Sequence, residues 1–249
     1  MIKILLSGAS GRMGSEIIKL VEQKENMSIT CGFDANINNN NEFKIFNDIN
    51  DIDEDVDVII DFSVPKATMT ILEYARKNNI PIVIATTGFN SDELKIIEKT
   101  SIDIPIFRSS NMSLDINLMA SIISKVAEVL SDADIEIIET HHNRKIDSPS
   151  GTAILLADAI NETIEEKKKY NFERMQKREK RDKNEIGFSS IRGGNIVGEH
   201  TVKFFGENET LEITHTAYSR QVFAEGAVKA AEFILDKDKG LYSMKDMVK

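Results

Sequence analysis

The chain has 249 residues, of which 41% are hydrophobic and 29% charged, a composition typical of an ordinary globular protein with two domains. Its formal net charge of −10 argues against nucleic acid as the main partner, because phosphate contacts need a basic surface. No apolar run approaches the roughly 18 residues of a membrane-spanning helix, and the first apolar run is too short for a signal peptide. We therefore expect a cytoplasmic protein without a nucleic-acid or membrane partner.

Three local features carry no chemistry of their own. Cys31 is the single cysteine, which excludes an intrachain disulfide and fits a reducing compartment. Residues 167–183 carry nine lysines and arginines interleaved with acidic residues, a mixture that indicates a solvated helix or loop. The asparagine run at 38–41 predicts a polar loop.

The first ninety residues alternate β-rich and helical runs, which predicts a parallel sheet flanked by helices. The expected strands are residues 2–6, 28–33, 56–61, 81–85 and 104–108. The expected helices are residues 15–22, 67–77 and 91–99. We expect Ser91 to be the N-cap of the third helix, with acidic residues in its first turn. This half of the chain predicts a Rossmann-like, doubly wound α/β fold.

After Asn111 the pattern changes to longer helices and strands joined by short turns, which implies a mixed or antiparallel sheet in an α+β domain. The expected helices are residues 118–130, 153–164 and 223–235. The expected strands are residues 135–139, 187–191, 198–205 and 211–215, with a hairpin loop at 206–210. Because the last helix is apolar on one face and can return to the first domain, we expect a dinucleotide-binding domain at 1–112 plus 222–249. Residues 113–221 then form the second domain.

The sequence Gly8-Ala-Ser-Gly11-Arg-Met-Gly14 lies between the first strand and the first helix, where a dinucleotide-binding fingerprint belongs. Gly8 permits a tight turn, Gly11 lets a pyrophosphate approach the backbone, and Gly14 lets helix and strand pack closely. The free amides at the helix start then receive the phosphates. The spacing is G-x-x-G-x-x-G rather than G-x-G-x-x-G, so a tight turn without a ligand stays open as an alternative.

Asp34 follows the second strand, where a carboxylate would accept hydrogen bonds from the adenosine ribose. This position favours NADH, because Ala35 follows and the next basic residue is Lys44. Arg12 can supply some charge for the 2′-phosphate of NADPH, so the use of both cofactors stays open. Residues 61–63 and 85–89 end two further strands and offer hydroxyls and amides for the nicotinamide at the same sheet edge.

The segment 139–153 holds most of the reactive side chains, including His141 and His142. A histidine can deliver a proton at neutral pH, and Lys145 brings positive charge close to it. Residues 150–152 begin a helix whose amides and threonine hydroxyl predict a cradle for a carboxylate. Adjacent histidines on a strand point to opposite faces, so we expect no metal site. A histidine-bearing strand followed by an ordinary capped helix is the alternative.

Six segments in chain order carry a family resemblance: residues 8–14, 85–89, 110–114, 139–145, 149–153 and 192–200. Together they resemble the 4-hydroxy-tetrahydrodipicolinate reductases, also called dihydrodipicolinate reductases, and the match runs from residue 2 to about residue 247. The resemblance implies reduction of this cyclic dicarboxylate to tetrahydrodipicolinate with NADH or NADPH and loss of water, in lysine and diaminopimelate biosynthesis. It also implies a homotetramer assembled through the sheets of the second domain.

Residue by residue, the resemblance implies that His141 is the proton donor and Lys145 its partner, with His142, Gly151 and Thr152 as substrate contacts. The cofactor contacts that it implies are Gly8, Ala9, Ser10, Gly11, Arg12, Met13, Asp34, Ala85, Thr86, Thr87, Ser109, Ser110, Asn111 and Met112. The chain departs from the family at Ala35, where some members carry a basic residue, and at Ala85, where many carry glycine. The first departure weakens the expectation of strong NADPH preference.

Two other functions stay open at this point. One is a different NAD(P)-dependent oxidoreductase acting on a small carboxylate, although enzymes of that kind that form a thioester need a catalytic cysteine and Cys31 lies on the cofactor side. The other is a dinucleotide sensor without turnover, which would need a DNA-binding element that the sequence does not offer.

Overall fold

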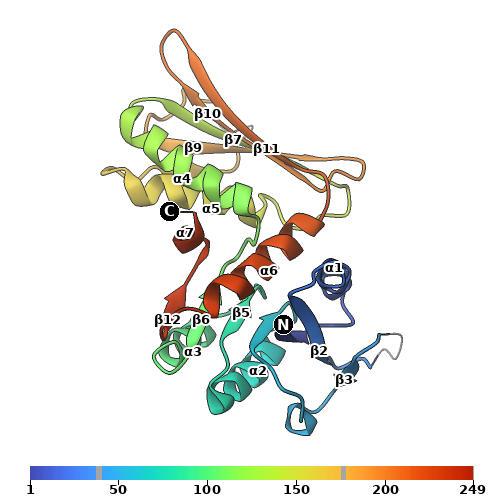
Figure 1. Ribbon diagram of the computed structural model, residues 1–249. Helices are drawn as coiled ribbons and strands as arrows, with labels where there is room; N and C mark the ends of the chain where they lie inside the picture. Colours follow the sequence, from blue (N-terminus) through green and yellow to red (C-terminus); the bar gives the residue numbers. More distant parts are fainter. Residues whose placement is uncertain (38–40, 175–177, 249) are drawn as a thin grey trace. The chain divides into compact units, whose positions relative to one another are not determined.

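The computed structural model describes residues 1–37, 41–174 and 178–248. The chain divides into two compact units (Figure 1). Unit 1 comprises Met1–Ser113 and Arg220–Lys249, and unit 2 comprises Leu114–Ser219. Residues 38–40 of the expected polar loop and 175–177 of the charged stretch lie outside the described residues. Within the described ranges, the protein has no helix with the length and hydropathy needed to cross a bilayer.

Unit 1 is built on a seven-stranded parallel sheet with the order β12-β6-β5-β4-β1-β2-β3. Its strands are β1 (Ile2–Ser7), β2 (Met27–Phe33), β3 (Lys44–Phe46), β4 (Val58–Asp61), β5 (Ile82–Ile84), β6 (Pro105–Arg108) and β12 (Gly240–Tyr242). The chain proceeds in opposite directions across the sheet from β1, so the topological switch point lies between β1 and β4. The predicted Rossmann-like class is confirmed.

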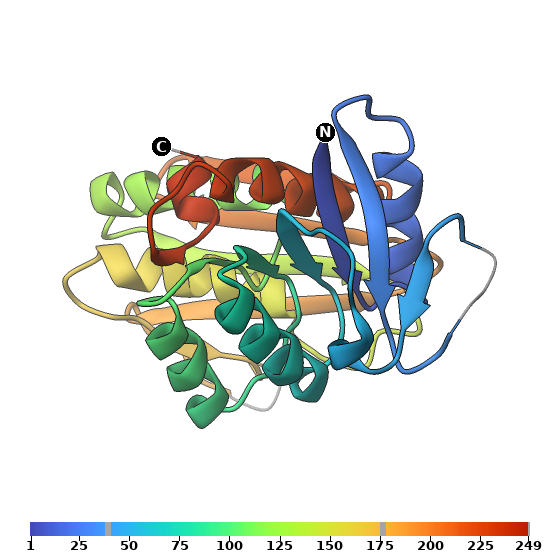
Figure 2. The ribbon, with the colours of Figure 1, turned by 60° about the horizontal axis from the view of Figure 1, so that its bottom comes forward.

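The helices of unit 1 cover both faces of this sheet, which explains why β4 and β5 are buried along their whole length. They are α1 (Arg12–Val21), the 3₁₀ helix η1 (Ile49–Asp51), α2 (Pro65–Asn78), α3 (Ser91–Thr100), α6 (Gln221–Ile234) and α7 (Met244–Met247). Helices α2 and α3 lie side by side (Figures 1 and 2) and pack on alternate residues of the central strands, including Leu5 and Ile59. Phe107 points the other way and contacts Phe233 of α6.

The prediction that Ser91 caps α3 is wrong. Asn90 is the N-cap, and its side-chain oxygen accepts the backbone N–H groups of Asp92 and Glu93. The Glu93 carboxylate in turn accepts the backbone N–H of Asn90, which completes a capping box. This reciprocal pair satisfies more of the helix-start amides than Ser91 could from one position further along the chain.

Unit 2 is built on a five-stranded mixed sheet with the order β11-β10-β7-β9-β8, as the predicted fold class requires. Its strands are β7 (Asp134–His141), β8 (Lys169–Asn171), β9 (Glu185–Arg192), β10 (Gly198–Phe205) and β11 (Thr210–Ala217). Helices α4 (Leu114–Val129) and α5 (Gly151–Thr163) lie together on one face of this sheet (Figure 1). Alternate residues of β7, among them Ile135 and Ile137, form the core with both helices.

The charged stretch at 167–183 differs in part from the expected solvated helix or loop. Residues 169–171 form β8, which pairs in parallel with β9. Arg181 lies against the sheet and forms ion pairs with Asp134 and Glu136, at 2.7 Å and 3.2 Å. Arg174 pairs with Glu136 and Glu185 at 2.8 Å and 2.6 Å. Arg174 and Arg181 therefore hold an edge of unit 2 together.

Candidate active site

The glycine turn of unit 1 connects β1 to α1 and leaves no room for a side chain at Gly8 or Gly14. Gly8 has a φ of +81°, and a Cβ on it would lie 2.3 Å from the Phe62 carbonyl oxygen. A Cβ on Gly14 would lie 2.4 Å from the Gly8 carbonyl oxygen. The backbone N–H of Gly8 donates to the Phe33 carbonyl at 2.9 Å, and that of Gly11 donates to the Gly8 carbonyl at 3.0 Å. The turn is therefore fixed by β2 on one side and by the loop after β4 on the other.

The start of α1 fits a dinucleotide phosphate. Its N-cap is Gly11, which provides no side-chain hydrogen bond, and its first turn holds no acidic residue. The amides of the first turn and the positive end of the helix dipole are thus not neutralised by a side chain of their own helix. Glycine at the cap also lets a ligand approach the backbone closely.

Asp34 lies beside this turn, as the sequence predicts. Its Oδ2 accepts the backbone N–H of Ser10 at 3.0 Å, and its Oδ1 accepts that of Asn36 at 2.9 Å. The Ser10 hydroxyl donates to the Asn36 carbonyl at 2.6 Å. These bonds join the loop after β1 to the loop after β2, and Ala35 next to them is exposed.

All the predicted cofactor contacts follow parallel strands at one edge of the unit 1 sheet, either in loops or, for Arg12 and Met13, at the start of α1. Residues 8–13 follow β1, Asp34 follows β2, residues 85–87 follow β5 and residues 109–112 follow β6. Within this set Thr86 is buried, with 4% of its surface exposed, whereas Thr87 is exposed. The two neighbouring threonines therefore differ in accessibility. The Thr86 hydroxyl forms its hydrogen bonds inside the protein, whereas the Thr87 side chain is exposed.

The centre of the unit 2 site is a buried carboxylate next to His141. Glu139 is 1% exposed, and its Oε2 lies 2.5 Å from Nδ1 of His141. Arg192 donates from both terminal nitrogens to the two carboxylate oxygens, each at 2.7 Å, in a bidentate pair. The backbone N–H of Ser150 donates to Oε1 at 3.1 Å. Glu139 thus holds the Nδ1 edge of the His141 ring and leaves its Nε2 for another partner.

The sheet register brings these residues together. Glu139 and His141 are two residues apart on β7, so both face the α4 and α5 side. Arg192 is the register partner of His141 across the parallel β7–β9 pair. Gly198 on β10 lacks a side chain where a Cβ would lie 3.0 Å from Nε2 of His141. Any larger residue at 198 would press on that nitrogen.

His200 links this cluster to the start of α5. Its ring contacts the His141 ring edge to face, with centroids 5.1 Å apart, and its Nε2 lies 2.9 Å from the Ser150 hydroxyl. Ser150 is the N-cap of α5, since its hydroxyl also accepts the backbone N–H of Ala153 at 3.1 Å. The helix that carries Gly151 is therefore fixed to the histidine cluster through one side chain.

Lys145 lies in the loop after β7 and forms an ion pair with Asp147 at 2.9 Å. Although partial burial opposes it, the Lys145 ammonium, with help from the Gly151 backbone N–H, holds the pKa of Asp147 below its usual range. The backbone N–H of His142 donates to the Ile196 carbonyl at 2.8 Å. Of the groups predicted to bind substrate carboxylates, Lys145 and the backbone N–H of Gly151 thus already contact the Asp147 carboxylate.

The electrostatics of the cluster follow from burial and pairing. Burial works against ionisation of Glu139, but the hydrogen bonds from His141 and Arg192 outweigh it and hold the Glu139 pKa well below its usual range. Burial, with the neighbouring His141 adding to the effect, lowers the pKa of His200 to about 3. His200 is therefore neutral at physiological pH, while Glu139 is a carboxylate paired with a guanidinium.

The sequence reasoning missed Glu139, Arg192, Gly198 and His200 as members of the site. The alternation of β7 is a signal that could have placed Glu139 beside His141. The other three come from β9 and β10, and their proximity depends on strand register. No set of three or more potential His, Cys, Asp or Glu metal ligands is found in the part of the chain that the structure describes.

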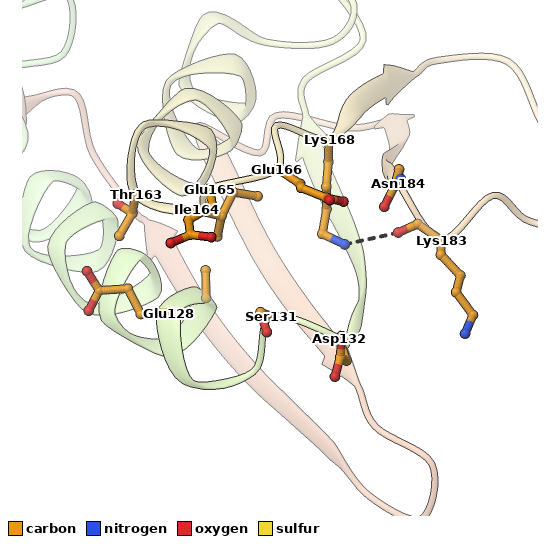
Figure 3. Close-up of a pocket in the computed structure, with 11 residues that line it drawn as sticks. Glu128, Ser131, Asp132, Thr163, Ile164, Glu165, Glu166, Lys168, Lys183 and Asn184 are labelled. Carbon is orange, nitrogen blue, oxygen red and sulfur yellow. Dashed lines mark hydrogen bonds between the residues drawn. The ribbon is translucent and has the colours of Figure 1, made fainter.

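A separate hollow lies at the other end of α4 and α5 (Figure 3). Its volume is about 850 Å³, and Glu128, Asp132 and Glu165 are among the residues that line it. The Lys168 ammonium donates to the Lys183 carbonyl at 3.0 Å across this hollow. None of the predicted site residues lines it, so we do not count it as part of the candidate site.

A dinucleotide turn on a parallel sheet and a histidine–carboxylate cluster on a second unit define a nicotinamide-dependent oxidoreductase. Comparison with known proteins gives the family. The family described as "Dihydrodipicolinate reductase, N-terminus" matches residues 2–112, and "Dihydrodipicolinate reductase, C-terminus" matches residues 115–248. The chain therefore belongs to the dihydrodipicolinate reductase family.

Individual relatives agree over their whole length. A 4-hydroxy-tetrahydrodipicolinate reductase from Caldanaerobacter subterraneus subsp. tengcongensis is 47% identical, with 100% of this chain and 99% of the relative covered. One from Clostridium novyi is 46% identical at the same coverage. A solved structure of dipicolinate-bound dihydrodipicolinate reductase from Paenisporosarcina sp. TG-14 has a TM-score of 0.81 at 26% identity and covers 99% of both chains.

The neutral, buried state of His200 predicts a pH-dependent stability. Its pKa falls from 6.5 to about 3 on folding, so below about pH 6.5 the unfolded chain binds a proton that the folded chain does not. The free energy of unfolding should therefore fall as the pH decreases from about 6.5 towards about 3. In His200→Gln, which cannot titrate, the fall between about pH 6.5 and about pH 5 should be smaller by up to about 2 kcal/mol. Urea unfolding of both proteins measures this, and equal slopes would contradict the account.

Proposed function

We propose that this protein reduces 4-hydroxy-tetrahydrodipicolinate to tetrahydrodipicolinate with NAD(P)H and loss of water, in lysine and diaminopimelate biosynthesis. The observation that carries the proposal is the His141–Glu139–Arg192 cluster beside the start of α5, in a chain whose first turn is built for a dinucleotide. The names of its relatives support the same reaction. No feature of the described residues favours a sensor without turnover.

His141 supplies the proton. Its Nδ1 is directed to the Glu139 carboxylate, which holds the Nδ1–H bond in both states of the ring: the imidazolium delivers its Nε2 proton to the substrate, and the neutral Nδ1–H form remains. When bound, the reduced nicotinamide supplies the hydride. Arg192 keeps Glu139 ionised and correctly turned, so the His141 ring keeps one orientation before and after it gives up its proton.

Lys145, His142, Gly151 and Thr152 bind the two carboxylates of the substrate. Lys145 offers an ammonium, and the first residues of α5 offer backbone amides at the positive end of a helix. A substrate carboxylate can take the place of the Asp147 carboxylate at Lys145. The ammonium is then paired with a carboxylate both before and after the substrate binds.

On the cofactor side, residues 8–13, Asp34, 85–87 and 109–112 bind the dinucleotide. NADH is favoured, because the Asp34 carboxylate suits a ribose diol and the exposed Ala35 brings no positive charge. Arg12 is exposed at the start of α1, so it can still accommodate the 2′-phosphate of NADPH.

Unit 1 acts as the dinucleotide-binding domain, and unit 2 acts in substrate binding and assembly of a cytoplasmic homotetramer. The sheet of unit 2 has a face opposite α4 and α5, and it carries Ile191 and Phe205, which are 52% and 39% exposed. Exposed apolar residues on a sheet face are suited to contact with a second copy.

Loss of the proposed acid and its partner should stop turnover without loss of cofactor. His141→Ala and Lys145→Ala should each reduce kcat by roughly 10²- to 10⁴-fold, as expected for a lost acid–base group. The dissociation constant of NADH should stay close to that of the unaltered protein, because both residues lie in unit 2. Steady-state kinetics with the condensation product of pyruvate and aspartate semialdehyde, together with NADH titrations, measure the two effects. A matching loss of NADH affinity would contradict this division of labour.

The cofactor preference should depend on residue 35. The unaltered protein should use NADH at least as well as NADPH, and Ala35→Arg should raise kcat/KM for NADPH about tenfold, the effect of one added phosphate contact. Ala35→Gln serves as the control of similar size without charge, and its preference should not change. A strong preference of the unaltered protein for NADPH would show that Asp34 and Ala35 do not set the choice.

A further inference from the structure

Asp61 is a buried carboxylate at the cofactor edge of the unit 1 sheet, in the segment 61–63 that the sequence predicts to lie beside the nicotinamide. It is the last residue of β4 and is 0% exposed. Strand β4 pairs with β1 on one side and β5 on the other, and Ser7 is the register partner of Asp61 on β1. Asp61 therefore lies at the switch point of the sheet, where dinucleotides bind in this class of fold.

Four hydroxyl groups donate hydrogen bonds to this carboxylate. Oδ1 accepts from Ser7 at 2.7 Å and from Ser63 at 2.5 Å. Oδ2 accepts from Thr68 at 2.6 Å and from Thr86 at 2.8 Å. A buried carboxylate is costly unless such bonds replace its water, and Thr68 places it beside the first turn of α2, whose dipole favours negative charge. The carboxylate is thus stabilised by hydroxyls and a helix start, and none of its hydrogen-bond donors in the described part of the chain is a side-chain cation.

The donors come from the end of one strand, from two loops and from one helix. Ser7 immediately precedes the glycine turn, Ser63 lies in the loop after β4, and Thr86 lies in the loop after β5. The Thr86 hydroxyl also accepts the backbone N–H of Ser63 at 2.9 Å. Since a hydroxyl has one proton, donation to Asp61 turns its lone pairs towards Ser63. By accepting the Thr86 proton, Asp61 thereby stabilises the Ser63–Thr86 hydrogen bond between two loops, in which Asp61 itself takes no part.

We propose that Asp61 is a positioning residue for the dinucleotide: it sets the loops after β1, β4 and β5, with Thr86 as the link to the loop that receives the nicotinamide. The buried Thr86 hydroxyl works inside the protein, and the exposed Thr87 and the backbone of the loop are left to face the ligand. This inference rests on the proposed function, because it assigns residues 85–87 to the cofactor.

A matched pair of variants tests the proposal. Thr86→Val and Thr68→Val each remove a hydroxyl that donates to the same Oδ2 atom, and each keeps the shape of the side chain. Only the Thr86 hydroxyl also joins the loops after β4 and β5. Thr86→Val should raise the dissociation constant of NADH about tenfold, whereas Thr68→Val should change it less than about twofold, although both lower the melting temperature. Thr86→Ser, which restores the hydroxyl, should restore NADH affinity.

Titrations of NADH and NADPH into the unaltered protein come first. Failure to bind either one would contradict the proposed cofactor site, whatever Asp61 does. If the unaltered protein binds NADH, equal losses of affinity in the two valine variants, or none in Thr86→Val, would overturn the positioning role. Asp61→Asn gives a further measurement, because an amide has one acceptor oxygen for four donors. It should raise the NADH dissociation constant and leave the substrate KM nearly unchanged, and a purely structural role would not separate the two.

Discussion

The hydrogen bonds to the buried Glu139 carboxylate hold the site of unit 2 together. They come from β7 through His141, from β9 through Arg192 and from the start of α5 through Ser150. Taking a carboxylate out of water is costly, and this one is tolerated because a guanidinium pairs with it and further donors occupy its oxygens. Each carboxylate oxygen accepts two of these bonds, so the loss of one donor changes the environment of the donors that remain. The effects of substitutions at these positions should therefore not add independently.

Each unit thus has a buried carboxylate that is hydrogen-bonded to residues of its candidate site, and the two carboxylates are stabilised in different ways. Glu139 is paired with a cation, so the charge next to His141, the proposed proton donor, is balanced. The donors to Asp61 among the described residues are hydroxyl groups, which hold loops in place without adding positive charge to the sheet edge. In both cases we propose that the residue that meets the ligand is oriented by one that does not. Substitutions of the buried carboxylates should therefore change function without removing a ligand contact.

The sequence predicted the fold class well because the relevant signals are local. The strand and helix periodicities of residues 2–108, and the glycine turn between the first strand and helix, are each contained in a short window. The three-residue strands β3, β8 and β12 were not predicted: they lie at the edges of their sheets and lack the continuous apolar run that marks the equally short central strand β5. The cap of α3 was misjudged between two adjacent polar residues, although Asn90 and Glu93 already had capping-box spacing.

The candidate site was predictable only as far as single segments reach. His141 and Lys145 could be found because they share one short segment with the helix start at Gly151. Arg192 lies 53 positions after Glu139, and the contact depends on the register between β7 and β9, which the sequence pattern does not determine. The sequence placed residues 61–63 at the cofactor edge, but the same limit hid the donors to Asp61, which lie up to 54 positions away on β1 and 25 positions away after β5.

The state of the His141 ring tests the central claim most directly. Nitrogen-15 NMR of histidine-labelled protein, with the His141 signals assigned by substitution, reports which ring nitrogen holds the proton when the ring is neutral. If Glu139 orients the ring, neutral His141 carries its proton on Nδ1, and Glu139→Gln weakens that preference. A neutral ring protonated on Nε2 in the unaltered protein, or a tautomer that is unchanged in Glu139→Gln, would contradict the account.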